Sequence, residues 1–178
     1  MLPIRMDARI ETPSKEQVKS KEFMVYLGSL LAADGKIASE LGRRLGLAQT
    51  DFTALTRVWK HSTLNRSKKL RIFKACVCSK LSYGLFTAAL NLKDRRRIDG
   101  FQARCLRKIL RIQHAYHSRI SNATVLEIAG ETPLSKKIAV QQQKYLMKLV
   151  ARDDTDPTRL CVFEAGSLEP RQCTGMRG

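Results

Sequence analysis

Residues 91–112 read NLKDRRRIDGFQARCLRKILRI, and this stretch decides the fold. Its apolar residues recur every three or four positions, the spacing that places side chains on one face of an α-helix. They are Ile98, Phe101, Cys105, Ile109 and Ile112. Asn91 is a residue type favoured at a helix N-cap, and Asp94 follows at the third helical position, near the positive end of the helix dipole. The pattern predicts a helix with one buried face and several basic ones.

The same periodicity predicts four more helices. They cover residues 37–59, 65–84, 121–130 and 132–149. Asn65, Ser121 and Thr132 are the candidate N-caps. Gly130 is expected to close the third of these helices, because glycine tolerates the left-handed conformation found just past a helix end. Pro133 suits the first position of the fourth, where no backbone N–H is needed.

Residues 23–31 read FMVYLGSLL, a short apolar stretch followed by Asp34 and Gly35. It is typical of a β-strand that ends in a turn, although a lone strand needs a partner that the chain scarcely supplies. The predicted fold class is therefore mainly α: about five helices in a bundle, preceded by one short β-strand or hairpin. The predicted parts are a lead-in at 1–22, the strand and turn at 23–35, a helical domain at 36–152 and a loose tail at 153–178.

Charge gives the main functional signal. The 178 residues include 33 Lys and Arg but 16 Asp and Glu, a formal net charge of +17. Residues 60–119 carry +14 of it, with 16 basic and 2 acidic residues. A solvated helix face normally mixes signs, whereas like charges repel and need a counter-charge. The block predicts a polyanionic partner, with nucleic acid ahead of an anionic membrane surface, and we expect no membrane partner.

Two of the predicted helices carry the expected contacts. Arginine suits phosphate because its guanidinium bonds two oxygens at once. We expect backbone contacts with steep salt dependence and little base readout. Aromatic residues are only 6% of the chain, which disfavours a stacking platform for single strands. The predicted nucleic-acid-binding residues are Lys68, Lys69, Arg71, Lys74, Arg95, Arg96, Arg97, Arg104, Arg107, Lys108 and Arg111.

Motifs of the common enzyme classes are missing from the sequence. It contains no glycine-rich phosphate loop, no GxSxG and no HExxH. The acidic run at 153–156 is expected to be solvated, because neighbouring carboxylates in a loop bind metals weakly without further ligands. An apolar run of about 18 residues or more, which a spanning helix needs, is absent, as is a secretory leader. We expect a protein that is not secreted.

Cysteines and histidines raise the question of zinc. Cys76 and Cys78 are two apart, so they point to different sides of a helix, and we expect both to be small packing residues. Cys105 with His114 and His117 lacks an evident fourth ligand. The sequence therefore predicts no metal and no cofactor in this chain. The odd number of cysteines, unevenly spaced, favours reduced thiols.

Seven short motifs follow one another in order between residues 23 and 150. They are FMVYLGSLLAADG at 23–35, ELGRRL at 40–45, LTRVW at 55–59, KLRIFKA at 69–75, SYG at 82–84, FQARCLRKIL at 101–110, and SN at 121–122 with PL at 133–134. This series resembles the late part of the reverse transcriptases of LINE-type (non-LTR) retrotransposons. In that family the stretch comprises the last palm strand, the helical thumb and the region beyond.

The resemblance implies a thumb that holds primer and template, so the partner would be RNA, DNA or an RNA–DNA hybrid. Tyr26, Leu27 and Gly28 would lie near the primer-gripping hairpin. The family polymerase uses Mg²⁺, and its setting implies a nuclear or cytoplasmic protein.

Departures from the family limit what the chain is expected to do. No catalytic aspartate pair precedes Phe23, and 22 residues cannot hold it together with the fingers. We therefore expect a fragment that binds nucleic acid without catalysis, with the missing palm and fingers as implied partners. The alternatives are a non-functional retroelement remnant and an unrelated basic helical RNA- or DNA-binding protein.

Overall fold

The computed structural model describes residues 21–61, 63–164 and 166–169. It is mainly helical, and one antiparallel hairpin precedes the helices, which confirms the predicted fold class. Two compact units are present: Leu41–Leu146, and a smaller one made of the described residues on either side of it. Nearly all of the predicted lead-in and the last residues of the predicted tail fall outside the described ranges.

The stretch at 23–31, for which the sequence predicts one short β-strand or a hairpin, forms a hairpin. Strands β1 (Phe23–Tyr26) and β2 (Ser29–Ala32) pair antiparallel, with two residues between them. These two, Leu27 and Gly28, have φ angles of 46° and 77°. A two-residue turn with both φ values positive matches the twist of paired strands, and Gly28 adopts it without steric cost. The strands thus supply the backbone partners that a single strand would lack.

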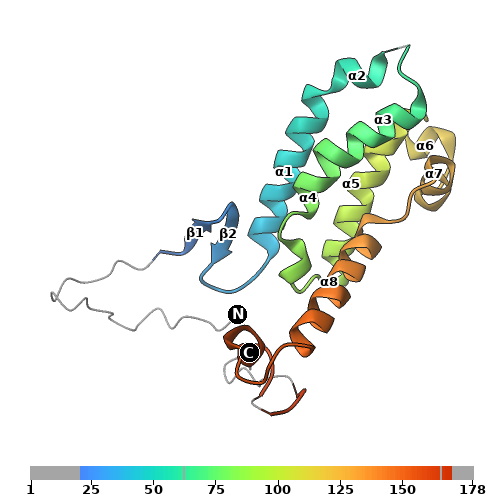
Figure 1. Ribbon diagram of the computed structural model, residues 1–178. Coiled ribbons are helices and arrows are strands. Elements are labelled where there is room, and N and C mark those ends of the chain that lie inside the picture. Colours follow the sequence, from blue (N-terminus) through green and yellow to red (C-terminus); the bar gives the residue numbers. More distant parts are fainter. Residues whose placement is uncertain (1–20, 62, 165, 170–178) are drawn as a thin grey trace. The chain divides into compact units, whose positions relative to one another are not determined.

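Helices make up most of the larger unit. In chain order they are α1 (Ala38–Ala54), α2 (Thr56–Lys60), α3 (Arg66–Ile72), the π-helical η1 (Phe73–Cys78), α4 (Ser79–Ser82), the 3₁₀ turn η2 (Leu85–Thr87), α5 (Leu92–Leu110), α6 (Ala115–Ser118), α7 (Asn122–Ala129) and α8 (Leu134–Val150). Figure 1 shows α1, α3, α4 and α5 running alongside one another. The first residues of α1 and the last residues of α8 belong to the smaller unit.

Local signals located most helix starts correctly. The side chains of Asn65, Asn91 and Ser121 each accept a hydrogen bond from the backbone N–H of the third residue of their helix. The predicted helix over 37–59 breaks at Leu55, where α1 gives way to α2. The Trp59 indole N–H donates to the carbonyl oxygen of residue 52 at 2.8 Å, which holds α2 against the end of α1.

Apolar residues of α1, of α3 to α4 and of α5 form a large part of the core. As predicted, α3 to α4 buries Leu70, Phe73, Val77 and Leu81, and α5 buries Ile98, Phe101, Cys105 and Ile109. The α1 segment adds Leu41, Ala48 and Phe52. The rings of Phe52 and Phe73 meet edge to face with their centroids 6.0 Å apart, so α1 and η1 share one aromatic contact.

The start of α8 differs from the prediction that Thr132 caps it. Its first N–H groups donate to side chains of α5: Leu134 to Gln102 Oε1 at 2.7 Å and Ser135 to Asp99 Oδ1 at 2.9 Å. The carbonyl oxygen of Thr132 accepts from Gln102 Nε2 at 3.1 Å instead. The cap is thus supplied by another helix, which local sequence does not reveal, and it anchors α8 on α5.

The predicted loose tail begins with a folded segment. The acidic side chain of Asp156 accepts from the Thr158 N–H at 2.7 Å and caps a short helix, α9 (Pro157–Leu160). Arg159, only 8% exposed, bonds the carbonyl oxygens of Val150 and Arg152. Proline at the first position of α9 needs no N–H, so the Asp-Pro pair begins a helix here as well as ending the earlier pattern.

Candidate nucleic-acid interface

Helix α5 carries the densest group of basic side chains. Its buried residues face the core, and its basic side chains other than Arg107 lie on the side that is left to solvent. Arg95, Arg96, Arg97, Arg104 and Lys108 are all exposed. Helical periodicity brings residues four apart to the same side, which places Arg96, Gly100 and Arg104 in one row.

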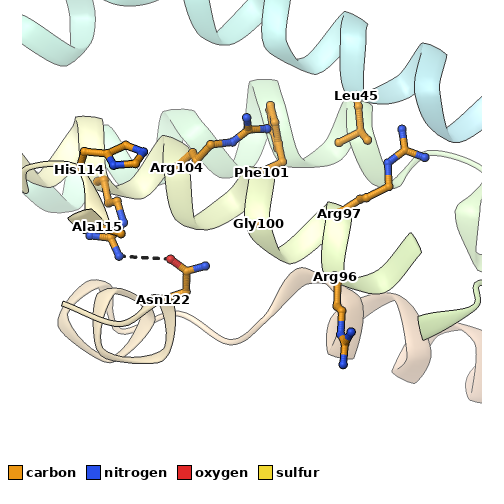
Figure 2. A pocket seen from close by; sticks show the side chains of 10 residues that line it. Leu45, Arg96, Arg97, Gly100, Phe101, Arg104, His114, Ala115 and Asn122 are labelled. Atoms are coloured by element: carbon orange, nitrogen blue, oxygen red, sulfur yellow. Dashed lines mark hydrogen bonds between the residues drawn. The ribbon is translucent and has the colours of Figure 1, made fainter. Parts of the chain in front are cut away.

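A hollow of about 480 Å³ opens along this row (Figure 2). Side chains of α5 form most of its lining: Arg96, Arg97, Phe101, Arg104 and Arg107, together with Gly100. The rest comes from Leu45 of α1, from His114 and Ala115 at the start of α6, and from Asn122 of α7. None of these lining residues is acidic. A positively charged hollow without carboxylates is suited to anions.

The exposed arginines around the hollow have few internal partners. Within the described ranges, the side chains of Arg96 and Arg104 make no hydrogen bond and no ion pair. Arg97 reaches Asp94 only at 3.9 Å, the outer limit of an ion pair. Their charges are therefore available to a ligand.

Arg107 is different, because it is buried with 6% of its surface exposed. Its guanidinium donates to four oxygens, all neutral: Gln113 O at 3.3 Å, Ser118 Oγ at 3.3 Å, Ile120 O at 2.6 Å and Asn122 Oδ1 at 3.2 Å. The last of these bonds is the dashed line in Figure 2. Arg107 therefore holds the loop between α5 and α7 and places a positive charge beneath the hollow.

Two predicted phosphate contacts on the α3 side are engaged inside the protein. Lys69 is buried, and its Nζ donates to Trp59 O at 2.8 Å. Lys74 Nζ lies 2.5 Å from the buried carboxylate of Glu131, which also binds Lys137 at 2.8 Å. Burial acts to raise the pKa of Glu131, but the hydrogen bonds and charges of the two lysines outweigh it and lower the pKa below its usual value. The sequence pattern missed both engagements.

The other predicted contacts lie outside the hollow. Lys68 and Arg71 are exposed on α3. Arg95 Nε donates to Leu90 O at 3.2 Å, and Lys108 Nζ lies 6.0 Å from the ring centre of a core phenylalanine. Arg111 ends α5 with a left-handed φ of 58° and donates to a carbonyl at 3.4 Å. These side chains extend the basic surface without lining its centre.

The hairpin residues expected near a primer belong to the smaller unit. Tyr26 is 58% exposed and Leu27 is 76% exposed, and the turn that they begin is completed by Gly28. Exposed apolar side chains of this kind are available for contacts. The two strands of the hairpin contain no charged residue.

The cysteines and histidines form no metal centre among the residues that the structure describes. Burial raises the pKa values of the Cys78 and Cys105 thiols to about 12, so both stay protonated at neutral pH. Cys76 is exposed, so the prediction that it packs inside was wrong. The backbone N–H of Tyr116 donates to His114 Nδ1 at 3.4 Å, which makes this histidine the N-cap of α6.

Sequence reasoning named the arginines of the hollow but missed three of its residues, Gly100, His114 and Asn122, as parts of one site. A glycine within an arginine-rich helix was a usable signal, because glycine costs helix stability. No local pattern joins His114 and Asn122 to α5, since they reach the hollow through the fold of the loop after it.

Comparison with known proteins gave no relative. No protein-family model, no curated protein and no solved structure matches the chain. Among the described residues, none of the helices combines the length and apolarity needed to cross a membrane.

Proposed function

We propose that this chain binds the phosphate backbone of nucleic acid through the arginine row of α5. The observation that carries the proposal is the set of arginines around the hollow, none of which has a close carboxylate partner within the described ranges. Clustering unpaired like charges costs free energy, and a polyanion offsets that cost. Phosphate contacts made by guanidinium groups give affinity with little sequence preference.

We infer further that the chain is a thumb-like fragment of a LINE-type reverse transcriptase that lacks the catalytic aspartates. The ordered motifs from FMVYLGSLLAADG to FQARCLRKIL support this inference. Under it, the missing palm and fingers of a full-length polymerase are the protein partners, and Mg²⁺ belongs to that missing part. Tyr26, Leu27 and Gly28 are then the residues near the primer-gripping hairpin, and the side chains of the first two are exposed.

A salt titration tests the binding function. The probes are a labelled DNA duplex and an RNA–DNA hybrid of the same sequence, with affinity measured by fluorescence anisotropy between 50 and 200 mM salt, the interval in which about six to ten phosphate contacts cost about 10³–10⁵-fold. We expect log affinity to fall linearly with log salt for both probes. An affinity that barely changes with salt would contradict the proposal.

The same measurement separates the proposal from its alternatives. A chain that shows no binding at low salt and no cooperative thermal melt by circular dichroism is a remnant. A chain that melts cooperatively and binds RNA hairpins far more tightly than the hybrid is a different kind of basic helical protein. The polymerase fragment requires that the hybrid bind at least as well as the DNA duplex and the RNA hairpins.

A further inference from the structure

The hollow over Gly100 has features that backbone binding along a flat basic face does not require. We propose that it is the seat of one phosphate group, which approaches the α5 backbone at Gly100 within the positive field of the arginines that line the hollow. This inference rests on the proposed function and narrows it, because it names the place where one phosphodiester of the nucleic acid sits.

Gly100 lies at the centre of the arginine row. It is four residues from both Arg96 and Arg104 and three from Arg97, so these side chains emerge around it. Figure 2 shows the heads of Arg96 and Arg97 on opposite sides of the helix segment that carries Gly100. A side chain at this position would enter the hollow that Gly100 lines. Glycine leaves that space open.

Core packing does not explain this glycine. A Cβ added at residue 100 would meet nothing within 4 Å, so no neighbouring element demands its absence. Glycine in a helix interior is also less favourable than alanine. The open space is part of a hollow of about 480 Å³, within the range of roughly 300–1,000 Å³ that small-ligand sites occupy. A ligand that comes close to the helix gives the glycine a role.

Arg107 adds an electrostatic reason for an anion. Its charge is buried, and all four of its hydrogen-bond acceptors are neutral. Buried charges are normally paired, because desolvation of an unpaired charge is costly. Arg107 lines the hollow, so a phosphate there supplies the missing counter-charge.

Two residues outside α5, His114 and Asn122, add uncharged hydrogen-bond donors to the lining of the hollow. Asn122 gives its Oδ1 to Arg107, and Figure 2 shows the amide nitrogen on the other side of that group. His114 accepts at Nδ1 from the Tyr116 N–H, so Nε2 is the ring nitrogen that is left to donate. Both residues line the hollow with N–H donors whose acceptor atoms are already engaged. The lining of the hollow therefore offers guanidinium, amide and imidazole donors to an anion.

The first experiment fills the hollow without changing charge. Gly100→Leu introduces a good helix former into the space, and Gly42→Leu on α1 is the matched control, since a Cβ at either glycine meets nothing within 4 Å and Gly42 lies outside the hollow. We expect Gly100→Leu to weaken binding of the labelled duplex about tenfold and to reduce the salt slope by about 1. Gly42→Leu should change neither. Gly100→Ala serves as a smaller obstruction if the leucine variant folds poorly by circular dichroism.

The second experiment uses inorganic phosphate alone with the full chain. In ¹H–¹⁵N NMR spectra, phosphate should shift the Asn122 side-chain amide and the Gly100 backbone amide of the wild type, and much less those of Gly100→Leu. Those shifts without any duplex binding would support the seat and contradict the proposed function. Unchanged duplex binding by Gly100→Leu, alongside weakened binding by Arg96→Ala, would overturn the seat and leave the proposed function in place. Absence of the phosphate shifts would also overturn the seat.

Discussion

Two arginine-rich regions of this protein use the same side chain in opposite ways. Around α9, each arginine meets a carboxylate: Arg152 pairs with Asp156 at 3.0 Å, and Arg159 pairs with Asp154 at 2.8 Å. On α5, within the described ranges, neither Arg104 nor Arg96, which lies two turns before it, has a carboxylate partner. An arginine that is paired with a nearby carboxylate stabilises the fold, whereas an arginine without such a partner is available to a ligand.

The buried arginines extend this contrast. Arg159 and Arg107 are both less than a tenth exposed, and both donate to backbone carbonyls. Arg159 also has the carboxylate of Asp154, while the acceptors of Arg107 are all neutral. The number of arginines in a segment therefore does not locate a site. What locates it is the lack of acidic partners, which requires the tertiary structure.

The largest expected effect comes from Arg107→Ala. It removes four hydrogen bonds and frees the loop between α5 and α7, so we expect the free energy of unfolding to fall by about 3 kcal/mol. Arg104→Ala, the exposed counterpart on the same helix, should stay within about 0.5 kcal/mol of wild type. Urea denaturation monitored by circular dichroism measures both. Equal values for the two variants would remove the distinction between a structural and a surface arginine.

Glu131→Gln tests the matched cluster of the larger unit. The carboxylate holds Lys74 and Lys137, so we expect a loss of about 2 kcal/mol at pH 7. The folded pKa of Glu131 is lowered, so its stabilisation is present above the unfolded value of about 4.3 and is lost as pH falls through the folded pKa. Thermal melts of both proteins from pH 7 to pH 3 should converge at the acidic end. A constant difference would contradict this assignment.

A smaller effect separates the two arginine-rich regions directly. Arg96→Ala with Arg104→Ala should weaken duplex binding about tenfold, because two phosphate-facing charges are lost. Arg152→Ala removes the same kind of charge from a matched pair and should change the affinity less than about twofold. Anisotropy titrations at one fixed salt concentration compare them. Equal losses would show that net charge alone governs binding.

The smallest effect is a gain in stability. Gly100→Ala and Gly42→Ala each replace a helix-interior glycine that has open space around it, so each should stabilise the fold by about 0.5–1 kcal/mol. Only the first should weaken phosphate binding. Thermal melts combined with anisotropy give both numbers. A stabilised Gly100→Ala protein with reduced affinity would show that the glycine serves the ligand and not the fold.

Some of this fold follows from local sequence because the responsible forces are local. The N-caps Asn65 and Asn91 were predictable, since a side chain bonds an N–H only a few residues away. The buried stripe of α5 was predictable from its period. The burial of Lys69 was not predictable. It lies beside the buried stripe of α3, and its long side chain carries the ammonium to a carbonyl ten residues earlier in the chain.

The hairpin is an example of a feature that local sequence only partly determines. The apolar stretch at 23–31 correctly indicated β structure, yet one strand and two strands have the same composition there. Pairing across Leu27 and Gly28 decided between them. The N-cap of α8 is a similar case. Thr132 was a reasonable local candidate, but Gln102 of α5 accepts the hydrogen bond from the first N–H of α8.

For this protein, spacing, caps and charge count were enough to determine a mainly helical chain with one strongly basic helix. Helical spacing and caps depend on interactions over one or two helical turns, so they can be recognised without knowledge of the tertiary structure. Which arginines keep a free charge depends on what packs beside them. Only the tertiary structure, by bringing α1, α6 and α7 to the arginine row of α5, decided that Arg107 is buried and that a hollow remains over Gly100.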